Sequence, residues 1–235
     1  MNHVVSFRPE MKFVNRERCI DVINIPLFKI VAMDGELKKI PHESALVFMS
    51  QIAFRIFLEK YGRDYSSSSG FAIGKITADL MIESGFTPIV PRIHDSMALA
   101  EEIANHLPVS TEIYIPSNLD HETILDTILE KTGYHVTRMY LYRYEPLNEK
   151  EEIDRAVSHE GFSGFVFTSP MEVKYFHSVS EGRYMQNKVH AIGRTTENEL
   201  MEMGYTNIGA TGNGNFEKLM EIICISPCSR ISSQA

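Results

Sequence analysis

The chain has 235 residues, of which 43% are hydrophobic and 23% are charged, a composition that suits one large or two small globular domains. Its net charge of −8 argues against a nucleic-acid-binding surface, because neutralising phosphates requires clustered basic residues. No apolar run reaches the roughly 18 residues needed to cross a bilayer, and residues 1–10 lack a signal-peptide pattern, so we expect a cytoplasmic protein that binds no membrane.

Short β-rich runs alternate with helical stretches along the chain, which is typical of parallel sheets covered by helices. The predicted strands cover residues 3–7, 21–32, 46–49, 71–74, 113–116, 136–144, 165–168 and 189–193. Predicted helices follow several of these strands, among them residues 97–106 and 120–131. We therefore predict the α/β class.

Residues 46–86 and 165–205 are similar to each other without a gap, so that position 46 pairs with 165 and position 86 with 205. The pairs include Val47 with Val166, Phe48 with Phe167, Ser50 with Ser169, Phe57 with Phe176, Gly74 with Gly193, Thr77 with Thr196 and Gly85 with Gly204. A strand–helix unit repeated over this distance indicates two similar α/β lobes. Paired lobes usually hold a ligand between them, so we expect a binding cleft there.

Two extended segments, residues 25–31 and 140–146, lie at matching places in the two halves. They are the expected crossovers between the lobes. Two crossovers imply that one lobe is discontinuous, built from both ends of the chain around a contiguous second lobe.

Hydroxyl side chains follow several predicted strands. Ser169 is predicted to begin a helix as its N-cap, with Glu172 completing a capping box; Thr196 with Glu199 fits the same pattern, and Thr77 stands at the equivalent place in the first copy. Each alone is most simply a helix cap. As a set, they would lie beyond the carboxyl ends of the strands, where open α/β sheets bind ligands. Helix N-termini attract anions there, so even an acidic protein can bind carboxylates or phosphates.

Three tyrosines, Tyr140, Tyr142 and Tyr144, alternate along a predicted extended segment and are expected to share one face. Two interpretations are open. The segment is a half-buried strand, or one of its phenols is exposed at the hinge between the lobes.

The three cysteines, Cys19, Cys224 and Cys228, include no C-x-x-C pair and have no histidine nearby. We therefore expect reduced thiols and no metal site. The glycine-rich stretch 209–214 is not G-x-G-x-x-G and is expected to follow a helix, so it does not predict a dinucleotide site.

The order and spacing of several short motifs resemble the uroporphyrinogen-III synthase family along almost the whole chain. The matching motifs are Arg8-Pro9, Ile25-Pro-Leu-Phe-Lys-Ile30, Val47-Phe-Met-Ser50, Ala72-Ile-Gly74 with Thr77, Ile115-Pro116 with Asn118-Leu119, Leu141-Tyr-Arg143, Val166-Phe-Thr-Ser-Pro170 and Ala191-Ile-Gly-Arg-Thr-Thr196. Each motif is degenerate by itself, and the resemblance rests on the set.

The resemblance implies two α/β lobes, each a parallel sheet flanked by helices, joined by a two-stranded ladder. Residues 1–27 and 144–235 would form the discontinuous lobe, and residues 28–143 the other. It further implies a lyase of tetrapyrrole (heme) synthesis that acts without a cofactor. Nothing in the sequence demands more than a monomer, and we expect no metal site. Such enzymes close the linear tetrapyrrole hydroxymethylbilane to uroporphyrinogen III, with loss of water and inversion of ring D. The eight carboxylates of this substrate suit the predicted helix N-termini.

Tyr142 matches the tyrosine of the family's V-Y-R-T-like motif and is the candidate for helping the terminal hydroxyl of the substrate to leave. The residues that match substrate-binding positions are Arg8, Ser50, Thr77, Ser117, Asn118, Ser169, Thr195 and Thr196.

The chain departs from the family pattern at three places, which affect the expected propionate contacts. The first helix is shortened at residues 10–19, a Pro-x-Gly loop is replaced by Pro116-Ser117-Asn118, and a common Arg is replaced by His121.

The alternative interpretation is a non-catalytic two-lobe sensor or binding protein for a small anionic ligand, because such proteins share this architecture. The presence of Tyr142 and the lack of a recognisable output module favour the enzyme. The enzyme interpretation expects Tyr142 to lie outside the core of a lobe and expects a cleft between the lobes.

Overall fold

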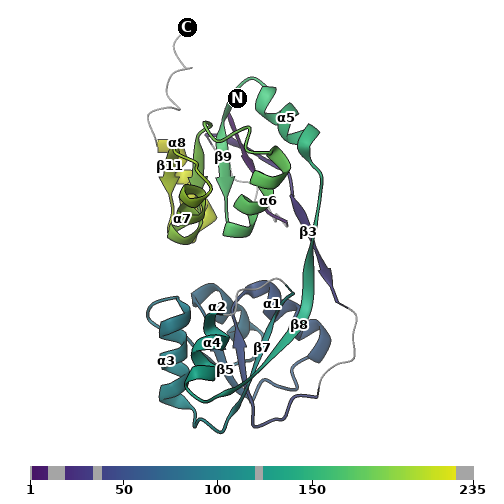
Figure 1. The fold of residues 1–235 in the computed structure, drawn as a ribbon, viewed down its shortest axis with the longest axis vertical. Helices are drawn as coiled ribbons and strands as arrows, with labels where there is room; N and C mark the ends of the chain where they lie inside the picture. The colour runs from purple at the N-terminus through teal and green to yellow at the C-terminus, as the bar shows by residue number, and fades with distance from the viewer. Residues whose placement is uncertain (1, 10–18, 34–38, 120–123, 226–235) are drawn as a thin grey trace. The chain divides into compact units, whose positions relative to one another are not determined.

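The computed structural model describes residues 2–9, 19–33, 39–119 and 124–225 (Figure 1). The chain divides into two compact units: unit 1 comprises Met1–Lys29 and Glu145–Ala235, and unit 2 comprises Ile30–Tyr144. It passes between the units twice, in β3 (Phe28–Ala32) and β8 (His135–Pro146), which are neighbours in one sheet.

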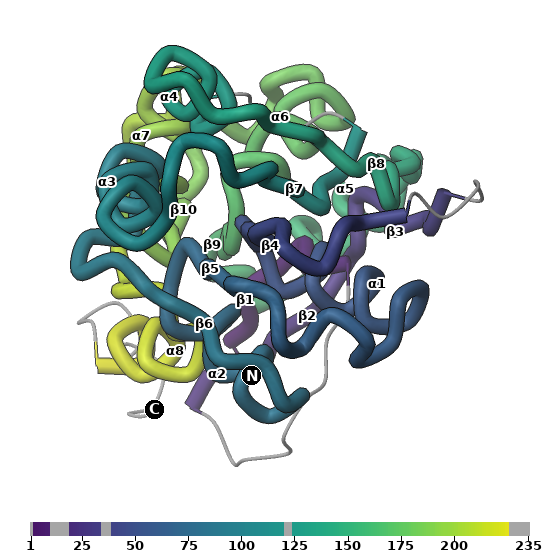
Figure 2. The backbone as a smooth tube through the Cα atoms, turned by 90° about the horizontal axis from the view of Figure 1, so that it is seen from below, coloured from purple at the N-terminus to yellow at the C-terminus, as the bar shows by residue number. Residues whose placement is uncertain are grey.

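Unit 2 is built on a sheet with the strand order β3-β8-β7-β4-β5-β6, in which β8, β7, β4, β5 and β6 pair in parallel. Its remaining strands are β4 (Ala45–Phe48), β5 (Ser69–Ala72), β6 (Pro88–Ile89) and β7 (Glu112–Asn118). One face is covered by α1 (Gln51–Tyr61) and α2 (Lys75–Glu83), and the other by α3 (Ser96–His106) and α4 (Ile124–Lys131) (Figure 2). Both faces are thus buried, as expected for a parallel sheet.

Unit 1 has a fully parallel sheet with the order β11-β10-β9-β1-β2. Its strands are β1 (His3–Ser6), β2 (Asp21–Asn24), β9 (Phe162–Phe167), β10 (Val189–Ala191) and β11 (Ile208–Thr211). Its helices are α5 (Lys150–Ser158), α6 (Pro170–Ser180), α7 (Arg194–Glu202) and α8 (Phe216–Ile225). Because strand side chains alternate between faces, Val166 packs with α8 while Phe165 and Phe167 stack around Phe7 and Phe176.

The repeat predicted from the sequence is confirmed, and it extends to the ends of the helices. α1 and α6 begin and end at positions that pair in the sequence alignment, as do α2 and α7. Gly85 and Gly204, which follow α2 and α7, have φ angles of 91° and 86°, a conformation that glycine adopts without strain at the end of a helix. The strand order is repeated as well, because β11-β10-β9-β1-β2 corresponds to β6-β5-β4-β7-β8.

The predicted α/β class is confirmed, with several element boundaries corrected. Residues 21–32 form two strands in two different sheets, β2 and β3, separated at Pro26, which cannot donate to a strand ladder. The glycine-rich stretch 209–214 begins inside strand β11 (Ile208–Thr211) and continues past its end, so it does not directly follow a helix. The predicted start of α4, the shortened first helix and His121 fall in residues 10–18 and 120–123, outside the described residues.

The expectation of reduced thiols is wrong for two of the cysteines. Cys19 and Cys224 form a disulfide bond with their Cα atoms 5.9 Å apart, although 205 residues separate them. The bond ties the segment before β2 to the end of α8. Spacing in the sequence could not reveal a pair that only the fold of unit 1 brings together.

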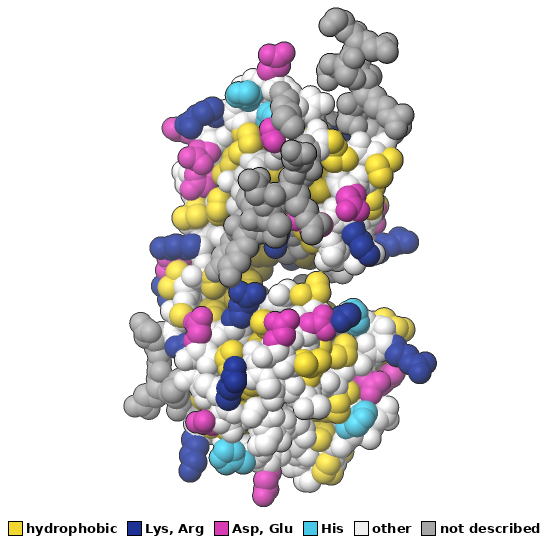
Figure 3. Space-filling view, turned by 180° about the vertical axis from the view of Figure 1, so that it is seen from behind, with side chains coloured by type: hydrophobic (Ala, Val, Ile, Leu, Met, Phe, Trp, Pro, Cys, Tyr) yellow, Lys and Arg dark blue, Asp and Glu magenta, His cyan; other side chains and the backbone are white. Residues whose placement is uncertain are grey.

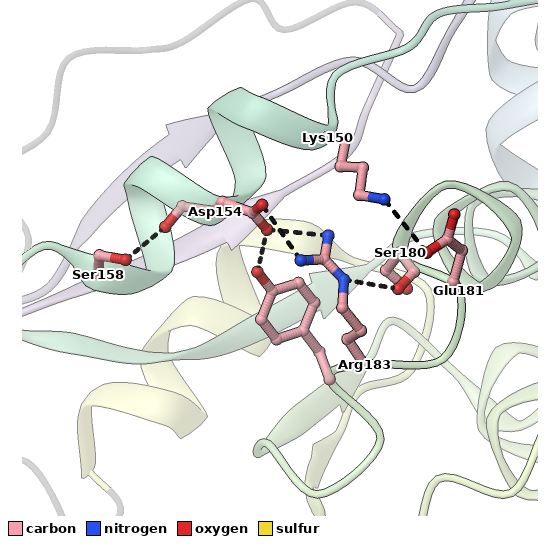
Figure 4. Close-up of polar contacts among 7 residues, drawn as sticks. Lys150, Asp154, Ser158, Ser180, Glu181 and Arg183 are labelled. Atoms are coloured by element: carbon pink, nitrogen blue, oxygen red, sulfur yellow. Dashed lines mark hydrogen bonds and ion pairs between the residues drawn. The ribbon is translucent and has the colours of Figure 1, made fainter.

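A polar network fixes α5 to the turn that follows α6 (Figure 4). Arg183 Nη1 donates to Asp154 Oδ2 at 3.2 Å, and the Tyr184 hydroxyl donates to the same carboxylate. Lys150 lies 3.1 Å from Glu181. The hydrogen bond from Tyr184, with the neighbouring charge of Arg183, lowers the pKa of Asp154, whereas burial and the same bond raise the pKa of Tyr184 to about 12.

Lys and Arg side chains lie scattered among Asp and Glu on the face drawn in Figure 3. Among the described helices, none combines the length and hydropathy needed to span a bilayer. Within the same residue ranges, no three His, Cys, Asp or Glu side chains gather as metal ligands would.

Candidate functional site

In unit 2, the end of β4 brings a serine and a tyrosine together. Ser50 is the N-cap of α1, and its Oγ accepts a hydrogen bond from the backbone N–H of Ala53 at 3.1 Å. The same Oγ lies 3.3 Å from the hydroxyl of Tyr142, which comes from β8. Because Ser50 directly follows β4, this hydroxyl pair lies at the carboxyl edge of the sheet.

A β-bulge determines where Tyr142 points. Ser117 pairs with Tyr140 and Asn118 pairs with Tyr142, which leaves Leu141 as an extra residue on β8. Tyr142 (1% exposed) is therefore buried together with Leu141 (6% exposed), whereas Tyr140 is 47% exposed. The expectation that the three tyrosines share one face is wrong, since the extra residue reverses the alternation. The exposed phenol is that of Tyr140.

Ser117 and Asn118 are the last two residues of β7, and both are buried. Ser117 Oγ donates to the carbonyl oxygen of Asn118 at 3.2 Å. Asn118 Oδ1 has no hydrogen-bond partner among the described residues. The loop expected at Pro116-Ser117-Asn118 is thus a strand end, held by pairing with β8.

The two threonines expected to begin helices lie one turn inside them. The N-caps of α2 and α7 are Gly74 and Gly193, so Thr77 and Thr196 occupy the third helical position and are buried. The N-cap prediction for Thr196 is therefore wrong. Glycine cannot cap with a side chain, and within the described residues neither N-cap makes a side-chain hydrogen bond to the first N–H groups of its helix. Thr195 is exposed in the first turn of α7.

In unit 1, Ser169 is the N-cap of α6, as predicted, and accepts from the backbone N–H of Glu172 at 3.2 Å. The carboxylate of Glu172 accepts from the backbone N–H and the hydroxyl of Thr168, at 2.6 and 2.5 Å. Burial raises the pKa of Glu172 to about 7, although these bonds and the positive charge of Arg8 favour the ionised form.

Arg8 follows β1 at the same edge. Its backbone N–H donates to Asn24 Oδ1 at 3.1 Å, and its carbonyl oxygen accepts from Asn24 Nδ2 at 2.9 Å. The guanidinium carbon lies 5.0 Å from the centre of the Phe216 ring. Sequence reasoning missed Asn24, whose role depends on the pairing of β1 with β2.

In each unit the predicted residues lie along one edge of the sheet, where parallel strands end; Tyr142 lies within β8, opposite the last residue of β7. In unit 1 these residues are Arg8, Ser169, Thr195 and Thr196, and in unit 2 they are Ser50, Thr77, Ser117, Asn118 and Tyr142. Hydroxyls, an amide, one guanidinium and open helix N-termini can together bind several carboxylates.

A pocket of about 430 Å³ lies elsewhere in unit 2, at the amino ends of β7 and β8. It is lined by Glu112, Tyr114, Glu130, Tyr134, His135, Val136 and Thr137. It is therefore at the opposite edge of the sheet from Tyr142, and it contains none of the predicted residues.

Comparison with known proteins identifies the family and the fold. The chain matches the family described as uroporphyrinogen-III synthase HemD over residues 11–221. The uroporphyrinogen-III synthetase of Helicobacter pylori is 19% identical with a TM-score of 0.69, over 95% of this chain and 98% of that one. A mutant uroporphyrinogen III synthase of Thermus thermophilus is 16% identical with a TM-score of 0.64, over 95% and 96%. The structures share the fold, and the family match covers most of the sequence: this chain belongs to the uroporphyrinogen-III synthase family.

Proposed function

We propose that the carboxyl edges of the two sheets bind hydroxymethylbilane and that this chain closes it to uroporphyrinogen III, with inversion of ring D. Membership of the family makes the chain a cyclising lyase of tetrapyrrole synthesis. The observation that supports the assignment of the site is that the nine predicted residues lie along the carboxyl edges of the two sheets, with Tyr142 opposite the end of β7, and α/β sheets bind ligands at such edges. The eight carboxylates of the substrate match the anion-binding character of helix N-termini.

Two tasks follow from the chemistry. The terminal hydroxyl of the substrate must leave as water, which a positioned hydrogen-bond donor assists. The distal ring must then attack in its inverted orientation, which requires one conformation of the chain to be held. Tyr142 and Ser50 supply paired hydroxyls for the first task. The other predicted residues at the sheet edges suit the second task, which is to hold the substrate in one conformation.

For the lobe boundaries, the location and the partners, the proposal is the one made from the sequence. The lobes would be residues 1–27 with 144–235, and residues 28–143, with the substrate held between them. The enzyme would act as a cytoplasmic monomer, without cofactor, nucleic acid or membrane as a partner.

The test supplies hydroxymethylbilane, made freshly in a coupled reaction, and separates the oxidised uroporphyrin isomers by chromatography. Uncatalysed closure gives isomer I, so a dominant yield of isomer III is expected with the protein present. Isomer I alone, formed at the uncatalysed rate by a protein with a folded circular dichroism spectrum, would contradict the proposed function.

A further inference from the structure

The internal repeat supplies a comparison for Glu172. Position 172 pairs with position 53, which is occupied by Ala53 in the first turn of α1. Both side chains are buried, with 1% of Ala53 and 2% of Glu172 exposed. The two N-caps, Ser50 and Ser169, have the same φ of −156° and the same hydrogen bond to the third helical N–H. The repeated junction therefore forms equally well without a carboxylate.

Glu172 is costly in this position, because a buried carboxyl must either lose its charge or be compensated. Its bonds to Thr168 compensate part of that cost. Arg8, at the end of β1, is the charged side chain whose field acts on it, and Lys174 of the same helix is paired instead with Glu199 of α7 at 3.4 Å. The carboxyl thus stands in the first turn of α6 and within the field of Arg8, at the edge where the proposed function places substrate carboxylates.

We propose that Glu172 is a positioning residue that takes up a proton when a substrate carboxylate binds beside Arg8. This rests on the proposed function. An ionised Glu172 competes with the substrate for the field of Arg8 and repels a second carboxylate, whereas a protonated Glu172 does neither. The proton comes from solvent. In the protonated form, the acid donates to the Thr168 hydroxyl and still accepts from the Thr168 N–H, so the turn keeps its geometry.

The pH dependence of KM tests this proposal. For the unaltered enzyme we expect KM to rise about tenfold between pH 6 and pH 8 with little change in kcat, as uptake of one proton by a group of pKa about 7 requires. Glu172→Gln keeps both bonds to Thr168 and is neutral, so its KM should stay low and flat over this range. Glu172→Ala recreates the Ala53 junction and should fold; its KM should also be flat, but raised at both pH values because Thr168 is no longer held.

Glu202→Gln is the matched control, since Glu202 is exposed at the end of α7. The KM of this variant should rise with pH as in the unaltered enzyme. A KM of the unaltered enzyme that does not change with pH overturns the proposal. So does a Glu172→Gln variant that follows the same pH dependence.

Binding of uroporphyrin III, a stable porphyrin with the same eight carboxylates, separates this proposal from the proposed function. Its affinity, measured by fluorescence, should weaken with rising pH for the unaltered protein and not for Glu172→Gln. If isomer III is not formed but this difference is found, the proposed reaction fails while the proton-linked site stands. If isomer III is formed and the affinities of both proteins change alike with pH, the role of Glu172 is refuted.

Discussion

Tyr142 combines two properties that the sequence could not show together. Its ring belongs to the core of unit 2, in edge contact with Tyr144 at 5.7 Å, while its hydroxyl reaches Ser50 at the carboxyl edge of the sheet. A ring held by packing fixes the direction of its hydroxyl more firmly than an exposed one. The expectation that Tyr142 lies outside a lobe core is therefore wrong for its ring, and the proposed role rests on its hydroxyl alone.

Removing that hydroxyl should affect turnover more than stability. For Tyr142→Phe we expect kcat to fall on the order of a hundredfold, because the leaving hydroxyl loses its donor. The unfolding free energy should change by only about 1 kcal/mol, the usual net value of one hydrogen bond. Coupled isomer-III assays and denaturant titrations measure the two quantities. Tyr140→Phe, on the exposed face of β8, is the matched control, and an unchanged kcat in Tyr142→Phe would exclude the proposed role.

Glu172 should also make stability depend on pH. Its folded-state pKa of about 7 lies above the ordinary 4.5, so between these values the folded protein keeps a proton that the unfolded chain has lost. The stability contributed by this proton is fully present below pH 4.5 and is lost as the pH rises through 7. Relative to Glu172→Gln, the unaltered protein should lose on the order of 3 kcal/mol over this window. Denaturant midpoints at pH 5, 6, 7 and 8 measure the difference, and parallel curves would refute it.

Local rules predicted some residues of the site and failed at others. Ser169 was recognisable as an N-cap because its capping signals are adjacent in sequence. Thr196 was misplaced because Gly193 begins α7 three residues earlier without a side-chain signal. The direction of Tyr142 depends on a register shift between β7 and β8, which no local pattern encodes.

At the scale of elements, α4 is attached to β8 by a buried ion pair. Arg138 donates through Nε and Nη2 to Asp126 Oδ2, with 8% and 12% of the two side chains exposed. The first turn of α4 thus depends on the strand that carries Tyr142. The repeat was predictable from sequence similarity, and the start of α6 from its capping signals, but this tertiary contact was not.

Breaking that pair should destabilise unit 2. For Asp126→Asn we expect a loss of about 3 kcal/mol in unfolding free energy, because the buried charge of Arg138 loses its ion pair with Asp126. The double variant Asp126→Leu with Arg138→Met should recover most of the loss. Asp79→Asn removes the exposed ion pair with Lys75 on α2 and should cost less than about 1 kcal/mol. Equal losses for the buried and exposed pairs would contradict the prediction.

At the scale of the whole molecule, the α/β class and the two similar units were predictable, because the sequence shows both the alternation of strands with helices and the internal repeat. The Cys19–Cys224 bond was not, since the partners come from opposite ends of the chain. Their closeness reflects how unit 1 is assembled, with β1 and β2 placed beside β9.

The matching strand orders have a consequence for connectivity. In unit 2 the five corresponding strands follow one another along the chain in the order β4, β5, β6, β7 and β8. In unit 1 the equivalent strands would follow one another as β9, β10, β11, β1 and β2 if the two ends of the chain were joined. Unit 1 is thus a circular permutant of unit 2. A chain opened between residues 148 and 149, with the old termini joined by a glycine–serine linker, should fold with both units contiguous and still yield isomer III. Failure of this permuted chain to unfold cooperatively in a thermal scan would show that the native chain order itself is required.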